Sequence, residues 1–570
     1  MMTPRDQSSR QDIPYLIGGM IAAVLCLLWG VLWSAAWVGN HFSLPAINPL
    51  IFLSNVWQAG LHVNRWDPPA HPSIILVGLT CIAELSLVAL TIWGIIRYLS
   101  PRWQLRHYGT ASWATWADLK SFRSRKVSVP RFCLGRIGRD FLVSGPQDNI
   151  VVFGPARSGK TSGLVIPNDL TWHGASIRTD QKGERQRLTG HRLPGPSFTF
   201  APLEPDRSTV NINPAIWAQT RANAVQLSRQ FFQSMAGPSG LNHWQGRAAD
   251  LLAGLLLSGW GLVPQDDPPT ANEDPEEDTS SWQPDFRWIL KTLNAGPDAI
   301  QELMDTTHNL AGQELLGAWL AIPDRERGSI ASTLQDGLTL WNDDRVYLAT
   351  ATHTLPDPAE FLSSSATLWL SSPPTESARL RPLYSLVLWY LLDAAQKHAL
   401  AAPNGRLSGS DLALLLDEAG NFAKIPDLAS WLSYGPGLGI RFLLIFHDRA
   451  QIEALYGPEA TRTIWNNSHV KILLPGQSDP ATLQDFTKAI GKTTERMPGA
   501  PWDLPRWDGP TTARDLMSAD ELRRLATGQL VAILGSRQPV ICQQARYFRI
   551  PALRRLVDQG YGNDSLNFGP

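Results

Sequence analysis

The longest uninterrupted runs of apolar residues lie near the start of the chain. Residues 15–38 contain no charged side chain, and a stretch of this length can span the hydrocarbon core of a bilayer. Residues 74–96 form a second run, interrupted only by Glu84. The Leu, Ile and Val residues of this run favour insertion by roughly 4 to 8 kcal/mol, against a cost of about 3 kcal/mol for one central acid. Both runs are therefore predicted to cross a membrane, with Glu84 either a buried polar contact between helices or subunits, or a functional group.

The cations that flank the two runs predict their orientation. The segment between them, residues 41–73, contains Arg65 alone, whereas the outer flanks carry Arg5, Arg10, Arg97, Arg102 and Arg106. Lys and Arg concentrate on the cytoplasmic side of membrane spans. Residues 1–106 are thus interpreted as a membrane hairpin with both ends in the cytoplasm and residues 41–73 outside.

Beyond residue 107, short continuous apolar runs alternate with stretches of helical periodicity. Runs of this kind are typical of parallel strands that are buried on both faces of a sheet. Core strands are predicted at residues 149–153, 175–178, 366–370, 412–416, 442–446, 470–474 and 530–534, and edge strands at residues 134–136 and 141–143. The chain is therefore expected to form an α/β domain.

A phosphate-binding motif follows the first core strand directly. Residues 154–161 match G-x-x-x-x-G-K-[ST], and the residues after them can open a helix. In such a loop the backbone N–H groups and the helix N-terminus hold a polyphosphate. Lys160 would reach the β- and γ-phosphates, and Thr161 would complete a Mg²⁺ shell. The predicted nucleotide-binding residues are Gly154, Pro155, Ala156, Arg157, Ser158, Gly159, Lys160 and Thr161.

Two adjacent acids end the apolar run at residues 412–416. Because charged residues at the carboxyl end of a parallel strand lie where α/β sheets bind ligands, Asp417 and Glu418 are predicted to belong to the same site. Asp417 would hold Mg²⁺ directly or through water, and Glu418 would orient and polarise the attacking water. The run at residues 442–446 ends at His447, a candidate sensor of the γ-phosphate.

The distance between these motifs along the chain predicts an insertion. Too many residues separate Lys160 from Asp417 for the loops of one sheet. The nucleotide-binding domain is therefore expected to consist of residues 107–215 and 346–570, with an all-α domain at residues 216–345 between its two parts. Residues 247–262 are predicted to be a core helix of this insert, and residues 264–284, which are rich in Pro and acids, a disordered loop.

Composition adds two restrictions. The chain has 50 Lys and Arg against 51 Asp and Glu, a balance that argues against a dedicated high-affinity DNA-coating protein. This charge balance is still compatible with transient contacts between the protein and a DNA strand inside a channel. The four cysteines are scattered without the spacing of a metal or redox site.

Several motifs together resemble one family. The sequences GPARSGKTSGLVIPN, TDQKGE, LLLDEAGNFAKIP, QIEALYG, NNSHVKILLPG and DLMSADELRRL, with the ending QPVICQQARYF, are similar to those of type IV secretion coupling proteins of the TraG/TraD kind. These are membrane-anchored, DNA-translocating ATPases of conjugation. The resemblance covers nearly the whole chain and implies a RecA-like domain with an inserted all-α domain. It also implies ATP and Mg²⁺ as cofactors and a homo-hexameric ring.

The resemblance further implies a place and partners. The ring would sit at the bacterial inner membrane and pass single-stranded DNA with its relaxase to subunits of a type IV secretion channel. Lys160 and Thr161 match the family's nucleotide loop, and Asp417 and Glu418 match its second carboxylate motif. Two alternatives remain open: the same motor could deliver effector proteins, or the ring could be a recruitment platform that nucleotide only locks together.

The chain departs from the family pattern at several positions. His447-Asp448 stands where the family usually has Gln-Ser, and Gln181 stands where it often has Pro. An imidazole N–H can still donate to a γ-phosphate. The turn that in some members carries a trans-acting arginine reads Gly435-Pro436-Gly437 here, which leaves Arg441 and Arg449 as candidates for that role.

Overall fold

The computed structural model describes residues 108–126, 131–262, 282–496 and 511–564, together with Ser86, Ala89, Leu90 and Trp93. The first predicted span, most of the second, the loop at residues 41–73 and nearly all of the acidic loop lie outside the described residues. Within the part described, no helix has both the length and the apolarity needed to cross a membrane. The chain divides into two units, residues 1–108 with 494–512 and residues 109–493 with 513–570, and the second carries the sheet.

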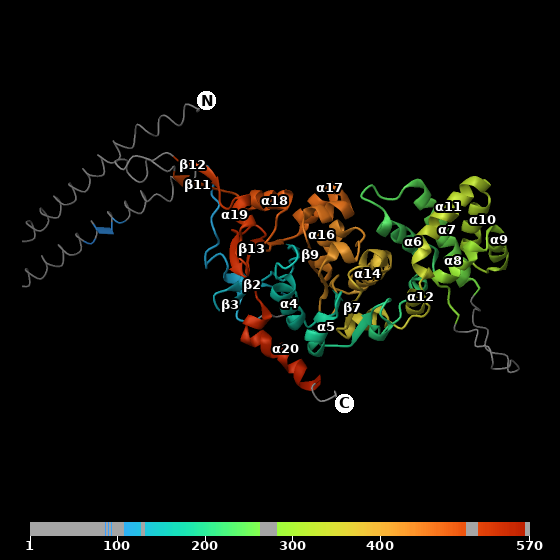
Figure 1. Ribbon diagram of the computed structural model, residues 1–570, viewed down its shortest axis with the longest axis horizontal. Coiled ribbons are helices and arrows are strands. Elements are labelled where there is room, and N and C mark those ends of the chain that lie inside the picture. Colours follow the sequence, from blue (N-terminus) through green and yellow to red (C-terminus); the bar gives the residue numbers. More distant parts are fainter. Residues whose placement is uncertain are drawn as a thin grey trace, which may run out of the picture. The chain divides into compact units, whose positions relative to one another are not determined.

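A large mixed sheet is the centre of this second unit (Figure 1). Among the described residues, its strand order is β1-β3-β2-β14-β13-β10-β4-β9-β8-β5-β7-β6. The pairs from β10 to β6 are all parallel, whereas those from β1 to β10 are antiparallel. The strands are β1 (Arg123–Ser124), β2 (Cys133–Ile137), β3 (Asp140–Val143), β4 (Ile150–Phe153), β5 (Ser176–Thr179), β6 (Ser197–Phe200), β7 (Thr367–Leu370), β8 (Leu412–Leu416), β9 (Ile440–Phe446), β10 (Val470–Leu473), β13 (Gln529–Leu534) and β14 (Val540–Gln543). A separate two-stranded sheet pairs β11 (Lys492–Arg496) with β12 (Thr511–Asp515).

Helices cover both faces of the parallel strands, as the continuous apolar runs require. On one face of β4, Val151 and Phe153 join a core that includes Phe486 of α18. On the other face, Val152 packs in a second core with Leu164 of the helix after the phosphate-binding loop. These helices are η1 (Lys120–Phe122), η2 (Thr161–Val165), α4 (Ile166–Thr171), α5 (Glu184–Thr189), η3 (Gly190–Arg192), η4 (Pro205–Arg207), η5 (Pro214–Ala218), α13 (Pro358–Ser363), α14 (Ser377–Ala401), α15 (Ala419–Phe422), α16 (Leu428–Leu438), α17 (Arg449–Asn467), α18 (Pro480–Ile490), α19 (Ala519–Arg523), η8 (Tyr547–Arg549) and α20 (Pro551–Asp564).

Within the described residues, the chain from 221 to 350 is helical. Its helices are α6 (Arg221–Met235), α7 (His243–Trp260), α8 (Phe286–Asn294), α9 (Pro297–Thr306), α10 (Leu310–Leu320), α11 (Asp324–Leu338), η7 (Thr339–Asn342) and α12 (Asp344–Thr350). Helix α7 is the predicted core helix: it starts with a capping box at Asn242 and is buried along most of its length. Figure 1 shows α6 to α11 grouped beside one another. The domain boundaries at residues 107–215, 216–345 and 346–570 stay a prediction.

The structure confirms each predicted core strand to within two residues, but two local predictions were wrong. The edge strands of the sheet are β1 and β6, not the predicted β2 and β3, which lie inside it. The pattern missed β1 because a pair of polar residues carries no apolar alternation. The glycines at 435 and 437 were predicted to form a tight turn but lie inside α16, and only Gly439, with φ of 91°, ends that helix.

Candidate active site

The phosphate-binding loop connects buried β4 to η2. Its first N–H, at Gly154, donates to the Phe446 carbonyl of the neighbouring strand β9 at 2.9 Å. The loop then turns through positive φ at Arg157 (64°) and Gly159 (85°), a conformation that Gly adopts at little cost. Lys160 precedes the first turn of η2, which continues into α4. The loop therefore has the strand–turn–helix context that a phosphate cradle needs.

The two predicted halves of the site meet although 256 residues separate them. The Thr161 hydroxyl donates to Asp417 Oδ2 at 3.0 Å, and Lys160 Nζ lies 3.2 Å from Glu418 Oε1. Asp417 and Glu418 follow β8 directly, at the same edge of the sheet as the loop after β4. The side chain of Lys160 is only 9% exposed, so bulk water cannot freely replace its contact with Glu418.

The two acids have opposite electrostatic environments. Burial raises the pKa of Asp417, with the charges of Lys160 and Arg185 acting against it. Burial alone would also raise the pKa of Glu418, but the Lys160 ammonium and, to a smaller extent, the His447 imidazole lower it below its ordinary value. Glu418 is therefore ionised at neutral pH, which makes it a weak base. Such a carboxylate suits the orientation of a water molecule better than complete removal of its proton.

The backbone holds Glu418 in an unusual conformation. Its φ of 55° and ψ of 42° are left-handed, which costs roughly 1 to 2 kcal/mol in a residue with a β-carbon. Nearby, Gln451 accepts from the His447 N–H at 2.9 Å and donates to Asn421 at 2.8 Å. Gln451 thus connects the end of β9 to the acidic turn after β8. Because β9 pairs in parallel with β8, His447 at the end of β9 lies near enough to act on the charge of Glu418, and its role as a sensor stays a prediction.

A cluster of buried charged side chains stabilises the arrangement of the elements that form the site. Asp169 of α4 accepts from Arg185 at 2.8 and 2.9 Å and from Arg178 at 3.3 Å, and all three side chains are buried. Arg185 also donates to the carbonyls of Thr179 and Leu415, in the strands β5 and β8. Burial lowers the pKa of Arg178 to about 10, with the Asp169 charge acting in the opposite direction, so Arg178 stays charged at neutral pH. The cluster fixes the position of α4 relative to β8, the strand that Asp417 follows.

Replacing Asp169 with alanine is expected to destabilise the chain by about 3 to 5 kcal/mol, because two buried guanidinium groups would lose their counter-charge. Urea unfolding followed by circular dichroism measures the shift of the midpoint. Asp305→Ala is the control, since Asp305 is exposed on α9. If the two variants had the same urea midpoint of unfolding, the stabilising role proposed for the charge cluster would be contradicted.

Sequence reasoning assigned no role to Gln544, which contacts the phosphate-binding loop, or to its neighbours Ala545 and Arg546. Gln544, buried just after β14, donates from Nε2 to the Ser158 carbonyl at 2.8 Å. The next N–H, at Ala545, donates to the Gly163 carbonyl of η2 at 3.1 Å. Arg546 Nε donates to Gln544 Oε1 at 3.0 Å. The sequence alone does not show which of the two neighbouring glutamines, Gln543 and Gln544, is buried. A correct prediction of β14 would have been needed to assign one side chain to the exposed face and the other to the buried face.

Replacing Gln544 with alanine is expected to weaken ATP binding by about tenfold, because the loop would lose a buried hydrogen bond worth roughly 1 to 3 kcal/mol. Titration with a fluorescent ATP analogue measures the change. Gln543→Ala is a matched control, since the neighbouring side chain is exposed. Equal affinities of the two variants would show that Gln544 does not shape the loop.

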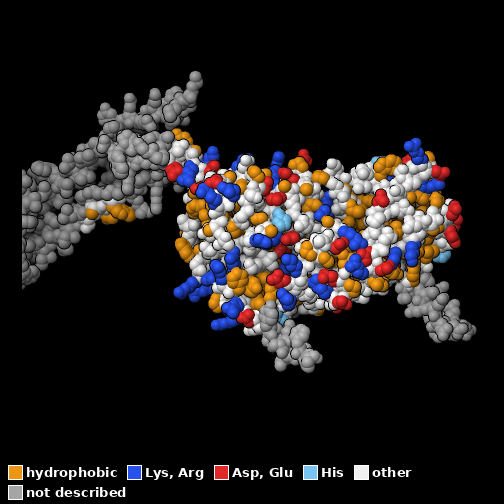
Figure 2. Space-filling view, in the orientation of Figure 1, with side chains coloured by type: hydrophobic (Ala, Val, Ile, Leu, Met, Phe, Trp, Pro, Cys, Tyr) orange, Lys and Arg blue, Asp and Glu red, His pale blue; other side chains and the backbone are white. Residues whose placement is uncertain are grey.

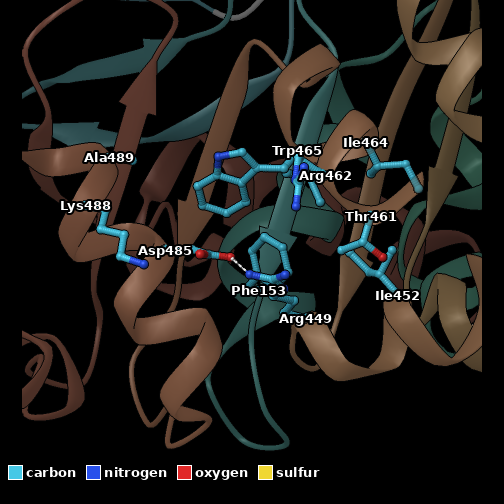
Figure 3. Close-up of a pocket in the computed structure, with 11 residues that line it drawn as sticks. Phe153, Arg449, Ile452, Thr461, Arg462, Ile464, Trp465, Asp485, Lys488 and Ala489 are labelled. Carbon is cyan, nitrogen blue, oxygen red and sulfur yellow. Dashed lines mark hydrogen bonds and ion pairs between the residues drawn. The ribbon is translucent and has the colours of Figure 1, made fainter. Parts of the chain in front are cut away.

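The two candidate trans-acting arginines differ in accessibility. Arg441 is fully buried at the start of β9, the end opposite His447, and pairs with Asp411 at 2.7 Å. A buried side chain cannot reach a neighbouring subunit, so this candidate is wrong. Arg449 is partly exposed and forms ion pairs with Glu453 and Asp485 in a pocket between α17 and α18 (Figure 3). The pocket includes Phe153 and lies on the face of β4 opposite the loop helix, so it is distinct from the nucleotide site.

Comparisons with known proteins agree with this geometry. A family model described as type IV secretory system conjugative DNA transfer matches residues 112–561. The chain is 25% identical over 505 residues to the protein VirD4 of Agrobacterium fabrum, which covers 85% of this chain and 72% of that protein. It is 26% identical over 375 residues to the conjugal transfer protein TraG of Escherichia coli, covering 62% of this chain and 56% of TraG.

Solved structures show the same fold. The plasmid coupling protein TrwB in complex with the ATP analogue ADPNP superposes with a TM-score of 0.56 and 16% identity, covering 79% of this chain and 97% of that one. TrwB in complex with ADP and Mg²⁺ superposes with a TM-score of 0.53 and 14% identity over the same shares. At this identity the likeness concerns the fold, and it supports the prediction of a RecA-like NTPase domain.

Proposed function

Since the chain belongs to the type IV secretory system conjugative DNA transfer family, we propose that it is a coupling ATPase that moves DNA to a secretion channel. One observation carries this proposal: the Lys160–Glu418 and Thr161–Asp417 contacts bring a phosphate-binding loop and two acids into one site. The alternative of a platform without catalysis would not need Glu418 beside the phosphate-binding lysine.

The residues present fit ATP and Mg²⁺. TrwB, a structural neighbour, has been solved with an ATP analogue and with ADP and Mg²⁺. In the chain itself, Asp417 Oδ1 is buried without a hydrogen-bond partner and lies on the carboxylate that contacts Thr161. A carboxylate and a hydroxyl are the ligands that Mg²⁺ takes in phosphate-loop enzymes. When bound, Mg²⁺ would neutralise charge that develops on the phosphates.

Each side chain then has a defined role in hydrolysis. Lys160 transfers its contact from Glu418 to the β- and γ-phosphates and stabilises the charge of the transition state. Glu418, released from Lys160, orients the attacking water. His447, at the end of the adjacent strand, donates a hydrogen bond to the γ-phosphate.

The further properties of the motor follow the family. We propose a homo-hexamer at the bacterial inner membrane, anchored through residues 15–38 and 74–96. The ring grips single-stranded DNA mainly through its phosphates, with little sequence preference. The helices α6 to α12 recognise the cargo, including a relaxase bound to the strand.

A transfer assay tests this function against delivery of proteins alone. Donor cells that lack the chain receive either the chain or its Lys160→Ala variant, and the transfer of DNA and of a reporter protein is scored separately. Restoration of DNA transfer by the chain and not by the variant supports the proposal. Restoration of protein transfer alone would favour the effector-delivering alternative.

A further inference from the structure

The cations of the chain are unevenly distributed. The chain as a whole is almost neutral, yet the twenty residues from Lys120 to Arg139 contain seven Lys or Arg and no acid. Four of them are exposed, namely Lys120, Arg125, Lys126 and Arg139. In Figure 2, Lys and Arg side chains gather at the end of the described surface where Figure 1 places β2 and β3.

No acid in the described surroundings neutralises these four side chains. Of the nearest acids in the described sequence, Asp140 pairs with Arg123 at 2.5 Å, and Asp118 accepts hydrogen bonds from Thr115 and forms no ion pair with any of the four. Within the described residues, none of the four exposed cations forms an ion pair. We call them, together with Trp116, the basic edge, because Lys120, Arg125 and Lys126 flank β1, a strand at one edge of the sheet, and Arg139 lies in the turn before its neighbour β3.

Trp116 gives the basic edge an amphipathic character. Its side chain is exposed (58%), although indole rings are usually more buried. One face of the ring is covered by the Arg123 guanidinium at 3.7 Å, and its edge lies beside Gly138 in the β2–β3 turn. An exposed indole among cations is typical of protein surfaces that meet the headgroup region of a membrane.

We propose that the basic edge binds the headgroups of anionic lipids on the cytoplasmic surface, an inference that rests on the membrane hairpin proposed above. Lys120 is the twenty-fourth residue after Ile96, where the second predicted span ends. A connection of this length, at most about 80 Å when extended, can place the basic edge at the same membrane surface. Each cation near such a surface strengthens binding roughly fivefold.

Single-stranded DNA is the other polyanion to be considered, and the ring of Trp116 argues against it. Binding of a strand without sequence preference uses aromatic faces on which bases stack. The basic edge has a single aromatic side chain, Trp116, and Arg123 covers one of its two faces. Successive bases therefore lack a row of rings to stack on, whereas contact with headgroups needs only the charges and the indole edge, so lipid fits the observed arrangement better.

Hydrogen–deuterium exchange of the full chain in vesicles tests this proposal. Because β1 is an edge strand, the amides of residues 120–126 report directly on what covers it. We expect their exchange to slow at least about fivefold in vesicles containing phosphatidylglycerol, relative to vesicles of phosphatidylcholine alone. The difference should disappear when the four cations of the basic edge are replaced by Gln. It should persist when four exposed cations elsewhere are replaced instead, namely Lys291, Arg325, Lys397 and Lys488.

Two results would overturn the proposal. One is equal exchange in the two kinds of vesicle. The other is slowing that appears only when a single-stranded oligonucleotide is added to phosphatidylcholine vesicles, which would assign the surface to nucleic acid. Carbonate extraction of the same vesicles tests the membrane hairpin separately. A chain that is extracted would contradict the hairpin, while the lipid dependence of exchange would still decide whether the basic edge binds anionic headgroups.

Discussion

Replacing Lys160 with alanine is expected to lower ATP turnover by about 10³-fold, to the background of the assay. A single group that stabilises transition-state charge in a site with little water contributes roughly 10²- to 10³-fold. Lys160 is, in addition, proposed to bind the β- and γ-phosphates. Its side chain is 9% exposed and contacts Glu418 at 3.2 Å, so the alanine variant would leave a buried site without this ammonium group. Phosphate release from the full chain in lipid vesicles measures the effect.

The control for this variant is Lys397→Ala, which removes an exposed lysine from α14. Its turnover should equal that of the unchanged chain. Membrane insertion of the Lys160 variant should be normal, because the site lies outside the predicted hairpin. Full ATP turnover of the Lys160 variant would refute the assignment of the loop at residues 154–161.

Replacing Glu418 with glutamine is expected to separate ATP binding from hydrolysis. The substitution keeps the shape of the side chain but removes its charge, and the loss of a group that orients and polarises water costs about 10²- to 10⁴-fold in turnover. Affinity for ATP should be equal or higher, because Lys160 no longer has a carboxylate at 3.2 Å that competes with phosphate. Single-turnover kinetics and titration with an ATP analogue measure the two effects.

Glu314→Gln is the control for this second variant, since Glu314 is an exposed acid on α10. It should leave both turnover and affinity unchanged. If the Glu418 variant lost ATP binding together with hydrolysis, the side chain would have a structural role, for example in holding Lys160 in position.

The parts of the site that could be predicted are those that local sequence determines. The loop at residues 154–161 and the acids after β8 each follow a continuous apolar run, and both features are recognisable within about ten residues. To predict that the loop and the acids meet, one further rule was needed: the carboxyl ends of parallel strands lie at the same edge of a sheet. The contacts of Lys160 and Thr161 agree with this rule, while the chemical roles of these residues remain predictions.

The parts that could not be predicted depend on contacts between distant segments. Arg178 stands in the middle of a strand, where a charged side chain is normally expected to face solvent, and only the position of Asp169 on α4 explains its burial. Gln544 reaches the loop because β14 pairs antiparallel with β13, an arrangement that a run of four residues does not reveal. The buried position of Arg441 likewise follows from its pairing with Asp411 across neighbouring strands.

The most direct test of the central claim is ATP turnover of the full chain in lipid vesicles, measured with and without single-stranded DNA. If the site at Lys160 and Glu418 drives DNA movement, DNA should increase turnover several-fold, and Glu418→Gln should abolish both the basal rate and the increase. Turnover that does not respond to DNA, or a response that persists in the Glu418 variant, would contradict the account.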